Sequence, residues 1–183
     1  MIKVINTKFS DVKIIEPKIH FDKRGYFFES FNQDEFNNKV GKIKFVQDNE
    51  SASSFGVLRG LHFQEAPFEQ SKLIRVIKGE IQDVVVDIRE NSPNYLKYIS
   101  VILNEENKRQ IFIPKGFAHG FLTISESAEV VYKVTDLWNK KAERSLKWND
   151  KDLNIEWPRL TTVKPLISEK DEQAALISQL SSD

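Results

Sequence analysis

The feature that most constrains the fold is an alternation of apolar and polar residues with a period of two, which dominates the middle of the chain. Such alternation is typical of β-strands with one buried face. It predicts a series of short strands: Val12–Glu16, Tyr26–Phe31, Ile43–Gln47, Val57–Phe63, Lys72–Lys78, Gln82–Arg89, Lys97–Leu103, Arg109–Ile113, Gly116–Ile124 and Glu129–Thr135. Lys78 and Gly79 are expected to form a tight hairpin turn. Many short strands without βαβ alternation favour an antiparallel sandwich or jelly roll over a doubly wound fold.

Helical periodicity is confined to two segments. One is Gln33–Val40, with Asn32 as a candidate N-cap, and the other is Glu169–Gln179, with Ser168 as a candidate cap. No internal repeat, low-complexity tract or compositional break marks a linker. We therefore expect one all-β domain over residues 1–183, with a few short peripheral helices and a peripheral helix or tail in the last ~10 residues.

Composition excludes several classes of function. Lys and Arg number 27, as do Asp and Glu, so no net field attracts nucleic acid or an anionic membrane. The chain has no cysteine, which excludes disulfides and thiolate chemistry. The N-terminal residues alternate in polarity and form no long apolar run, so neither a signal peptide nor a membrane span is predicted and a cytoplasmic location is expected.

The segment Val57–Gln64 carries the first candidate catalytic group, His62. Side chains alternate along an extended strand, which places Arg59, Leu61 and Phe63 on one face and Leu58, Gly60, His62 and Gln64 on the other. Two polar side chains beside a glycine suit the floor of a cavity better than an apolar core. The alternative is a structural histidine, which would be the better interpretation of His62 taken alone.

A second motif, Pro114–Phe121, has the spacing P-x-G-x-x-H and ends in His119-Gly120-Phe121. This spacing resembles the second conserved motif of cupins. Their first motif normally supplies H-x-H followed by a glutamate, where this chain has Gly60-Leu61-His62. With 3 histidines in the whole chain, a histidine-rich metal site is not expected.

Several charged and aromatic residues have two interpretations each. Three arginines and one lysine lie in or beside predicted strands, where they can bind phosphates or can be ordinary surface charges. They are Arg24, Arg59, Arg75 and Lys72. Asp171 follows Ser168 at the spacing of a helix-capping box, which competes evenly with a functional role. Tyr132 is equally consistent with an ordinary aromatic residue of a sheet.

Taken together and in this order, the motifs resemble one family. They are Asp22–Ser30, Phe45–Ser51, Leu58–Gln64, Gly79–Ile81, Val86–Arg89, Pro114–Phe121, Trp148–Asp150, Ile155–Pro158 and Leu166–Asp171. They resemble the dTDP-4-dehydrorhamnose 3,5-epimerase family, which consists of cupin-type isomerases of the dTDP-L-rhamnose pathway. The R-G-L-H-F-Q and P-x-G-F-A-H-G-F blocks carry most of the specificity.

The resemblance implies a jelly-roll homodimer without metal or organic cofactor, in which an early strand of one subunit completes the site of the other. The reaction it implies inverts C3 and C5 of dTDP-4-dehydro-6-deoxy-D-glucose to give dTDP-4-dehydro-L-rhamnose. His62 would be the base, Asp171 its orienting acid, Tyr132 the acid on the far side of the sugar and Lys72 a stabiliser of the enolate. The implied substrate-binding residues are Arg24, Phe27, Glu29, Gln47, Asn49, Arg59, Gln64, His119, Trp138, Glu143 and Lys170.

The chain departs from the family pattern at two places. Trp138 stands where the family has a tyrosine that stacks on thymine, and Asn139–Glu143 lacks the usual Ser-Pro. These departures leave open a relative that inverts C3 alone or acts on another nucleotide sugar. Two other classes of protein are less favoured. The missing H-x-H argues against a metal-dependent cupin, and the full set of matched residues argues against a non-catalytic sugar-binding module.

Overall fold

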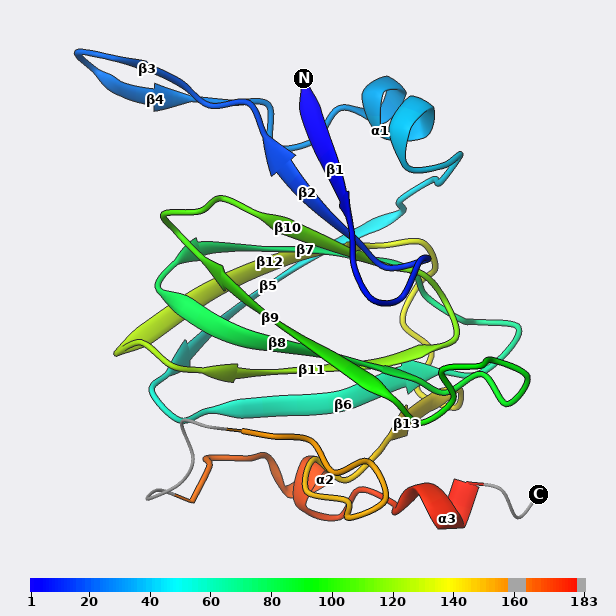
Figure 1. Cartoon of the computed structure of the whole chain (residues 1–183). Helices are drawn as coiled ribbons and strands as arrows, with labels where there is room; N and C mark the ends of the chain where they lie inside the picture. The colour runs from blue at the N-terminus through cyan, green and yellow to red at the C-terminus, as the bar shows by residue number, and fades with distance from the viewer. Residues whose placement is uncertain (158–163, 181–183) are drawn as a thin grey trace.

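Two antiparallel sheets stacked face to face form the body of the protein (Figure 1). The computed structural model describes residues 1–157 and 164–180. The six-stranded sheet has the order β1 (Ile2–Asn6), β2 (Lys13–Pro17), β10 (Gln110–Ile113), β7 (Lys72–Lys78), β12 (Ser127–Val134) and β5 (Gln47–Ser54). The five-stranded sheet has the order β13 (Glu143–Ser145), β6 (Leu58–Gln64), β11 (Phe117–Thr123), β8 (Glu80–Asp87) and β9 (Tyr98–Asn104).

The chain passes repeatedly from one sheet to the other, so most neighbouring strands are not consecutive in sequence. Every strand pair in the two sheets is antiparallel, and the described residues hold only short helices. This is the jelly-roll arrangement. The predicted all-β fold class is therefore confirmed. The predicted hairpin at Lys78 and Gly79 is wrong, because β7 and β8 belong to different sheets and do not pair; Gly79, with a φ of 77°, turns the chain from one sheet to the other.

Part of the space between the sheets is filled by aliphatic and aromatic side chains. Ile74, Val76 and Val130 of the six-stranded sheet pack against Ile81 and Phe121 of the other sheet in one buried cluster. Burying such side chains is the main favourable contribution to folding, about 1.5–3 kcal/mol each. The core therefore holds the two sheets together in a fixed arrangement.

The five-stranded sheet is also buried on its outer face. There the C-terminal part of the chain brings Leu146, Leu153, Trp157 and Ile177 against this sheet. The covering segment includes α2 (Glu169–Glu172) and α3 (Ile177–Leu180), drawn below the sheet in Figure 1. The predicted single helix Glu169–Gln179 is thus wrong in its middle, because Ala175 pairs with Leu146 in a parallel bridge.

The outer face of the six-stranded sheet carries α1 (Gln33–Lys39), which buries Phe36 against Phe112. As predicted, Asn32 caps this helix by accepting a hydrogen bond from the Glu35 amide. The predicted strand Ile43–Gln47 is wrong, because residues 43–46 have no regular structure.

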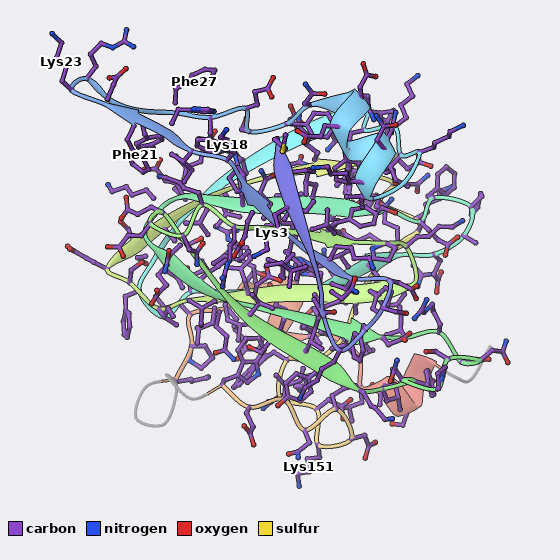
Figure 2. The ribbon with its side chains drawn as sticks, turned by 45° about the horizontal axis from the view of Figure 1, so that its top comes forward. Lys3, Lys18, Phe21, Lys23, Phe27 and Lys151 are labelled. Atoms are coloured by element: carbon purple, nitrogen blue, oxygen red, sulfur yellow. The ribbon has the colours of Figure 1, made fainter. Side chains whose placement is uncertain are left out.

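A hairpin of β3 (His20–Asp22) and β4 (Gly25–Phe27) protrudes from the body (Figure 1). Phe21 and Phe27 point into solvent from it, as Figure 2 shows. Pro158 of the Ile155–Pro158 motif and the last three residues of the expected tail lie outside the described residues. Within the part of the chain that the structure describes, no helix has both the length and the apolar character needed to cross a membrane.

Candidate active site

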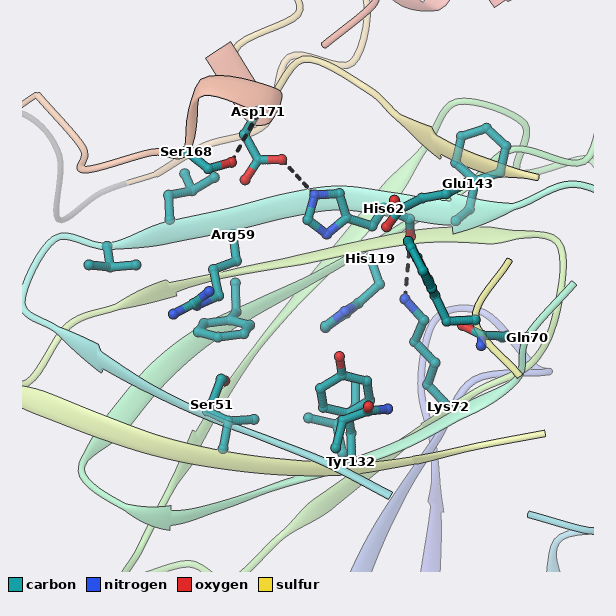
Figure 3. A pocket seen from close by; sticks show the side chains of 18 of the residues that line it. Ser51, Arg59, His62, Gln70, Lys72, His119, Tyr132, Glu143, Ser168 and Asp171 are labelled. Carbon is teal, nitrogen blue, oxygen red and sulfur yellow. Dashed lines mark hydrogen bonds and ion pairs between the residues drawn. The ribbon is translucent and has the colours of Figure 1, made fainter. Parts of the chain in front are cut away.

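A cavity of about 850 Å³ lies between the two sheets, and it brings together most of the residues that the sequence singled out. Residues of β6 and β11 line one wall, and residues of β5, β7 and β12 line the other (Figure 3). The predicted site residues that line it are Gln47, Asn49, Arg59, His62, Gln64, Lys72, His119, Tyr132, Trp138, Glu143 and Asp171.

Strand β6 turns both Arg59 and His62 toward the cavity. Their predicted placement on opposite faces is wrong, because the pairing of β6 with β11 shifts register. His62 pairs with His119 but Arg59 pairs with Phe121, so three steps on β6 match two on β11. Such an irregularity reverses the alternation of side chains.

Two facing glycines make this irregularity possible. Gly60 has a φ of 126°, and a Cβ at this position would lie 2.5 Å from the Cα of Gly120. A Cβ on Gly120 would in turn lie 2.7 Å from the Arg59 carbonyl oxygen. Both positions therefore require glycine, and through them the backbone sets the direction in which His62 points.

His62 is bound to a buried carboxylate from the far end of the chain. Its Nε2 lies 2.5 Å from Oδ1 of Asp171, 109 positions later in sequence. The Asp171 side chain is 4% exposed, while that of His62 is 29% exposed. The other ring nitrogen of His62 is left on the cavity side (Figure 3).

The charge of Asp171 is maintained by its hydrogen bonds. Burial alone would raise the pKa of this carboxyl group, but the hydrogen bond and charge of His62, with further donors from Ser168 and Gly60, hold the pKa below its usual value. A carboxylate on Nε2 keeps the proton there and leaves the cavity-facing nitrogen free to accept one. This geometry suits a general base.

The C-terminal segment is held at three points by β13 and by residues that flank β6 and β13. Leu166 pairs with Val57, Ala175 pairs with Leu146, and Lys170 forms a 2.6 Å ion pair with Glu143 of β13. Between these points, Ser168 caps α2 by accepting a hydrogen bond from the Asp171 amide. These contacts place Asp171 beside His62.

Tyr132 projects from β12 on the opposite wall, and its hydroxyl points toward His62 and His119 (Figure 3). Burial raises the pKa of this phenol above its ordinary value; the Arg59 charge opposes the rise and the Glu143 charge adds to it. The phenol is therefore protonated at neutral pH. It lies where an acid is needed if His62 works on the other face of a bound ring.

Lys72 of β7 and His119 of β11 line the cavity between the base and the phenol. Burial lowers the pKa of Lys72 to about 8, against the opposing effect of Asp83 and Glu143. Its ammonium group donates a long hydrogen bond of 3.4 Å to the His62 carbonyl oxygen. Lys72 is thus a cation with donors available to an anionic oxygen in the cavity.

Other polar residues occupy the mouth of the cavity. Gln47 donates to Asn49 over 2.8 Å, and Trp138 is 55% exposed beside them. Arg59 donates to the Ser53 hydroxyl and to the Ala52 carbonyl oxygen. These side chains form a rim suited to a polar, partly aromatic ligand.

Gln64 and Lys170 are committed to contacts within the protein. The Gln64 amide donates to the carbonyl oxygens of Phe68 and Leu137 and accepts from the Asn139 amide. It therefore holds two loops at the cavity mouth. Lys170 does not line the cavity and acts on it through the Glu143 ion pair.

The structure does not bring Arg24, Phe27 and Glu29 into the cavity of their own chain. Arg24 lies on the protruding hairpin and pairs with Asp22 at 2.6 Å, and Phe27 is 69% exposed. Glu29 lies 4.0 Å from the N-terminal amino group. These three predicted site residues are separated from His62 within one subunit.

Two residues near the site escaped the sequence prediction. Asp83 is fully buried behind His119, and its only sequence signal is a carboxylate inside the otherwise apolar run of β8. Ser51 lines the cavity with a buried hydroxyl that has no partner among the described residues. Within the same residues, no group of three His, Cys, Asp or Glu side chains is arranged to hold a metal ion.

Known proteins of one family resemble this chain over nearly its whole length. The model of the family described as dTDP-4-dehydrorhamnose 3,5-epimerase matches residues 6–179. The enzyme of that name from Shigella flexneri is 53% identical over 169 residues, which are 92% of each chain.

Solved structures show the same fold. The epimerase of Legionella pneumophila in complex with dTDP-4-keto-L-rhamnose superposes with a TM-score of 0.93 at 46% identity, covering 97% of this chain and 94% of the other. A 3′-monoepimerase of Streptomyces bikiniensis in complex with dTDP-quinovose gives 0.89 at 31% identity, covering 94% and 87%. With a family match over nearly the whole sequence and a relative sharing half of its residues, this chain belongs to the dTDP-4-dehydrorhamnose 3,5-epimerase family.

Proposed function

We propose that this protein converts dTDP-4-dehydro-6-deoxy-D-glucose into dTDP-4-dehydro-L-rhamnose by inverting C3 and C5, and that His62 and Tyr132 transfer the protons. The observation that carries the proposal is the placement of these two residues on opposite walls of one cavity, with Asp171 behind His62. A base and an acid on opposite faces of a ring produce inversion at carbon.

The first step is removal of a proton next to the ketone. The C4 carbonyl group acidifies the hydrogens on C3 and C5, because the resulting carbanion is delocalised onto oxygen as an enolate. The free ring nitrogen of His62 accepts the proton, and the Asp171 carboxylate stabilises the imidazolium that forms. This step requires no redox partner.

The enolate oxygen then needs a cation or hydrogen-bond donors. Lys72 supplies an ammonium group in a partly buried position, where an oriented donor contributes about 3 kcal/mol. His119 lies next to His62 on the neighbouring strand and faces the same space. Tyr132 then protonates the carbon from the opposite face and is reprotonated from solvent. His62 releases its proton to solvent, so both groups are ready for the second carbon.

The nucleotide supplies binding energy away from the reacting carbons. Arg59 offers a guanidinium group to the diphosphate, and Gln47, Asn49 and Trp138 form the rim where the nucleoside would lie. Binding energy from such remote groups positions the sugar for proton transfer. Trp138 offers a larger aromatic face than tyrosine for stacking on thymine.

The proposal includes a homodimer in which each subunit completes the neighbouring cavity. The protruding hairpin supports it, because Arg24 is isolated from its own cavity while Phe21 and Phe27 expose aromatic surface beside it. In the dimer, Arg24, Phe27 and Glu29 would reach the nucleotide bound by the partner.

The test is solvent-deuterium uptake followed by NMR in D₂O with the dTDP-linked 4-keto sugar. We expect deuterium at both C3 and C5, together with conversion to the L-configured product. Uptake confined to C3 would instead assign the activity of a monoepimerase, which the likeness to the Streptomyces bikiniensis enzyme makes the second candidate. Absence of uptake at both C3 and C5 would refute both candidates.

A further inference from the structure

Asp83 is a buried carboxylate that the proposed chemistry does not use. It lies on β8 with no exposed side-chain surface, and its Oδ2 is 2.8 Å from Nε2 of His119. Its second oxygen has no hydrogen-bond partner in the part of the chain that the structure describes. A buried charge is costly unless it is paired, so its retention beside a reaction cavity calls for a physical explanation.

The hydrogen bond from His119 determines how that imidazole faces the cavity. His119 pairs directly with His62 across β11 and β6 and lines the same space. With Nε2 engaged by Asp83, only Nδ1 remains for a ligand. Burial lowers the pKa of His119, whereas the charge and hydrogen bond of Asp83 raise it.

Lys72 feels the same carboxylate without being bound to it. Among the described residues, Lys72 forms no ion pair within 4.0 Å, and its ammonium group donates a hydrogen bond to the His62 carbonyl oxygen. The charge of Asp83 nevertheless raises the pKa of Lys72 more than any other charge does. Glu143 also raises it, and Lys170 lowers it. The other titratable groups that line this cavity are Glu50, Arg59, His62, His119, Tyr132 and Asp171.

This separation has a chemical advantage. A direct ion pair would occupy the donors of the ammonium group and leave less of its field for a new anion. A carboxylate bonded to the neighbouring imidazole still attracts the ammonium group through a poorly screened interior. The lysine donors then remain free for the oxygen on which charge develops, which is the preorganisation that stabilises an enolate.

We propose that Asp83 is a positioning residue of the oxyanion site: it orients His119 through a hydrogen bond and adds a negative charge behind the site without consuming the donors of Lys72. The proposal rests on the proposed function in one respect, since the enolate oxygen is the anion that Lys72 and His119 would meet. Its electrostatic part concerns the free protein and can be tested there.

The kinetic test compares Asp83→Asn with Asp87→Asn. Asp87 is also fully buried on β8, but it binds Arg89 and Ser92 rather than a cavity residue, so its replacement controls for loss of a buried carboxylate. For Asp83→Asn we expect the alkaline limb of the pH profile of kcat to move to lower pH by about 1 unit. We also expect kcat to fall about 10- to 100-fold at pH 8, less at pH 6, with a smaller change in KM.

Asp87→Asn should lose stability but keep the alkaline limb of the wild-type protein. If Asp83→Asn loses activity by the same factor at every pH, or keeps the wild-type limb, its role is structural and the proposal fails.

The second test needs neither turnover nor a variant. NMR titration of the ligand-free wild-type protein follows the Lys72 ammonium group and the ring nitrogens of His119. We expect Lys72 to titrate near pH 8 and neutral His119 to carry its proton on Nε2, the nitrogen that faces Asp83. A Lys72 that is neutral at pH 7, or a neutral His119 with its proton on Nδ1, would overturn the proposal even if Asp83→Asn fails to fold. Because this titration uses no substrate, its result is separable from a failure of the deuterium-uptake test.

Discussion

Lys72 illustrates how a single buried cation lowers the stability of the protein that carries it. Burial lowers its pKa from 10.5 to about 8, so the folded state binds this proton less strongly than the unfolded chain does. Between these pH values the unfolded state holds more protons, and stability rises with pH. Below pH 8 the full cost of the buried charge is present.

Replacing Lys72 by methionine should therefore stabilise the protein while removing activity. A pKa difference of this size corresponds to about 3 kcal/mol, and about 2 kcal/mol of extra stability is expected at pH 7. The gain should shrink as the pH rises from 8 toward 10. Urea unfolding at pH 7 and pH 9.5 measures both values, and a variant less stable than wild type at pH 7 would contradict the argument.

Tyr132→Phe should separate proton removal from inversion. The phenylalanine ring keeps the packing on β12 but has no proton to give, while His62 and Asp171 remain intact. We expect deuterium uptake with retained configuration to continue, and formation of the inverted product to fall about 100-fold or more. His62→Ala serves as the comparison, because it should abolish uptake itself. If Tyr132→Phe loses deuterium uptake and inversion to the same extent, Tyr132 is not the acid on the far side of the sugar.

The sequence alone identified residues far better than it identified contacts. Periodicity singled out His62 because a polar residue beside a glycine is unusual in a buried strand. It had no means of linking His62 to Asp171, which is 109 positions away, and that pairing came from the family resemblance. Asp83 escaped notice because an isolated carboxylate in an apolar strand shows nothing of the imidazole that it meets.

At the level of elements, α2 is a four-residue helix that contains Asp171 and places it beside His62. Ser168 caps it by accepting a hydrogen bond from the Asp171 amide over 3.1 Å. Helix α1 offers a matched case, since Asn32 accepts from the Glu35 amide over the same 3.1 Å. The two caps are alike in geometry, but only Ser168 adjoins the site.

Ser168→Ala and Asn32→Ala should therefore differ in their effect on catalysis. Each loses a cap contributing about 1 kcal/mol. We expect kcat to fall about 5- to 20-fold in Ser168→Ala, because Asp171 then loses its fixed orientation, and to stay unchanged in Asn32→Ala. Chemical denaturation and initial rates on the two variants provide the comparison. A similar kcat in both would show that the cap does not position Asp171.

Elements that lie between apolar layers were the easiest to predict. The strand β7, Lys72–Lys78, has the predicted bounds because it alternates between the core and α1-side packing. The strand β5 was missed because its residues, Gln47–Ser54, include almost no apolar side chain. It faces the polar cavity on its inner side, so the alternation that marks other strands is absent there.

At the scale of the whole molecule, the hairpin of β3 and β4 projects from a body that is otherwise closed around its core. An exposed Arg24 at its tip and exposed phenylalanines along it are poorly explained by a monomer. They agree with an arm that docks on a second copy of the chain. Closed two-fold dimers with exchanged elements satisfy both partners at once.

Mixing two inactive variants tests this arrangement. Arg24→Ala removes the arm's charge and His62→Ala removes the base, so each homodimer should be impaired in every site. In a mixed dimer, one cavity would combine an intact His62 with an intact Arg24 from the other subunit. After exchange of equal amounts, about one quarter of the sites should recover. Activity that stays at the sum of the separate variants would rule out an arm that serves the partner's cavity.

The contact between Asp171 and His62 also bears on how the enzyme comes into being during translation. All the strands of both sheets are encoded before residue 146, whereas the carboxylate that prepares the base belongs to the segment that docks on β6 afterwards. A ribosome would therefore synthesise the strands of both walls before it delivers the carboxylate that, in the proposed mechanism, orients His62. Translation products that end upstream of Asp171 would retain the strands but lack the His62–Asp171 hydrogen bond. Activity would then distinguish full-length chains from truncated ones.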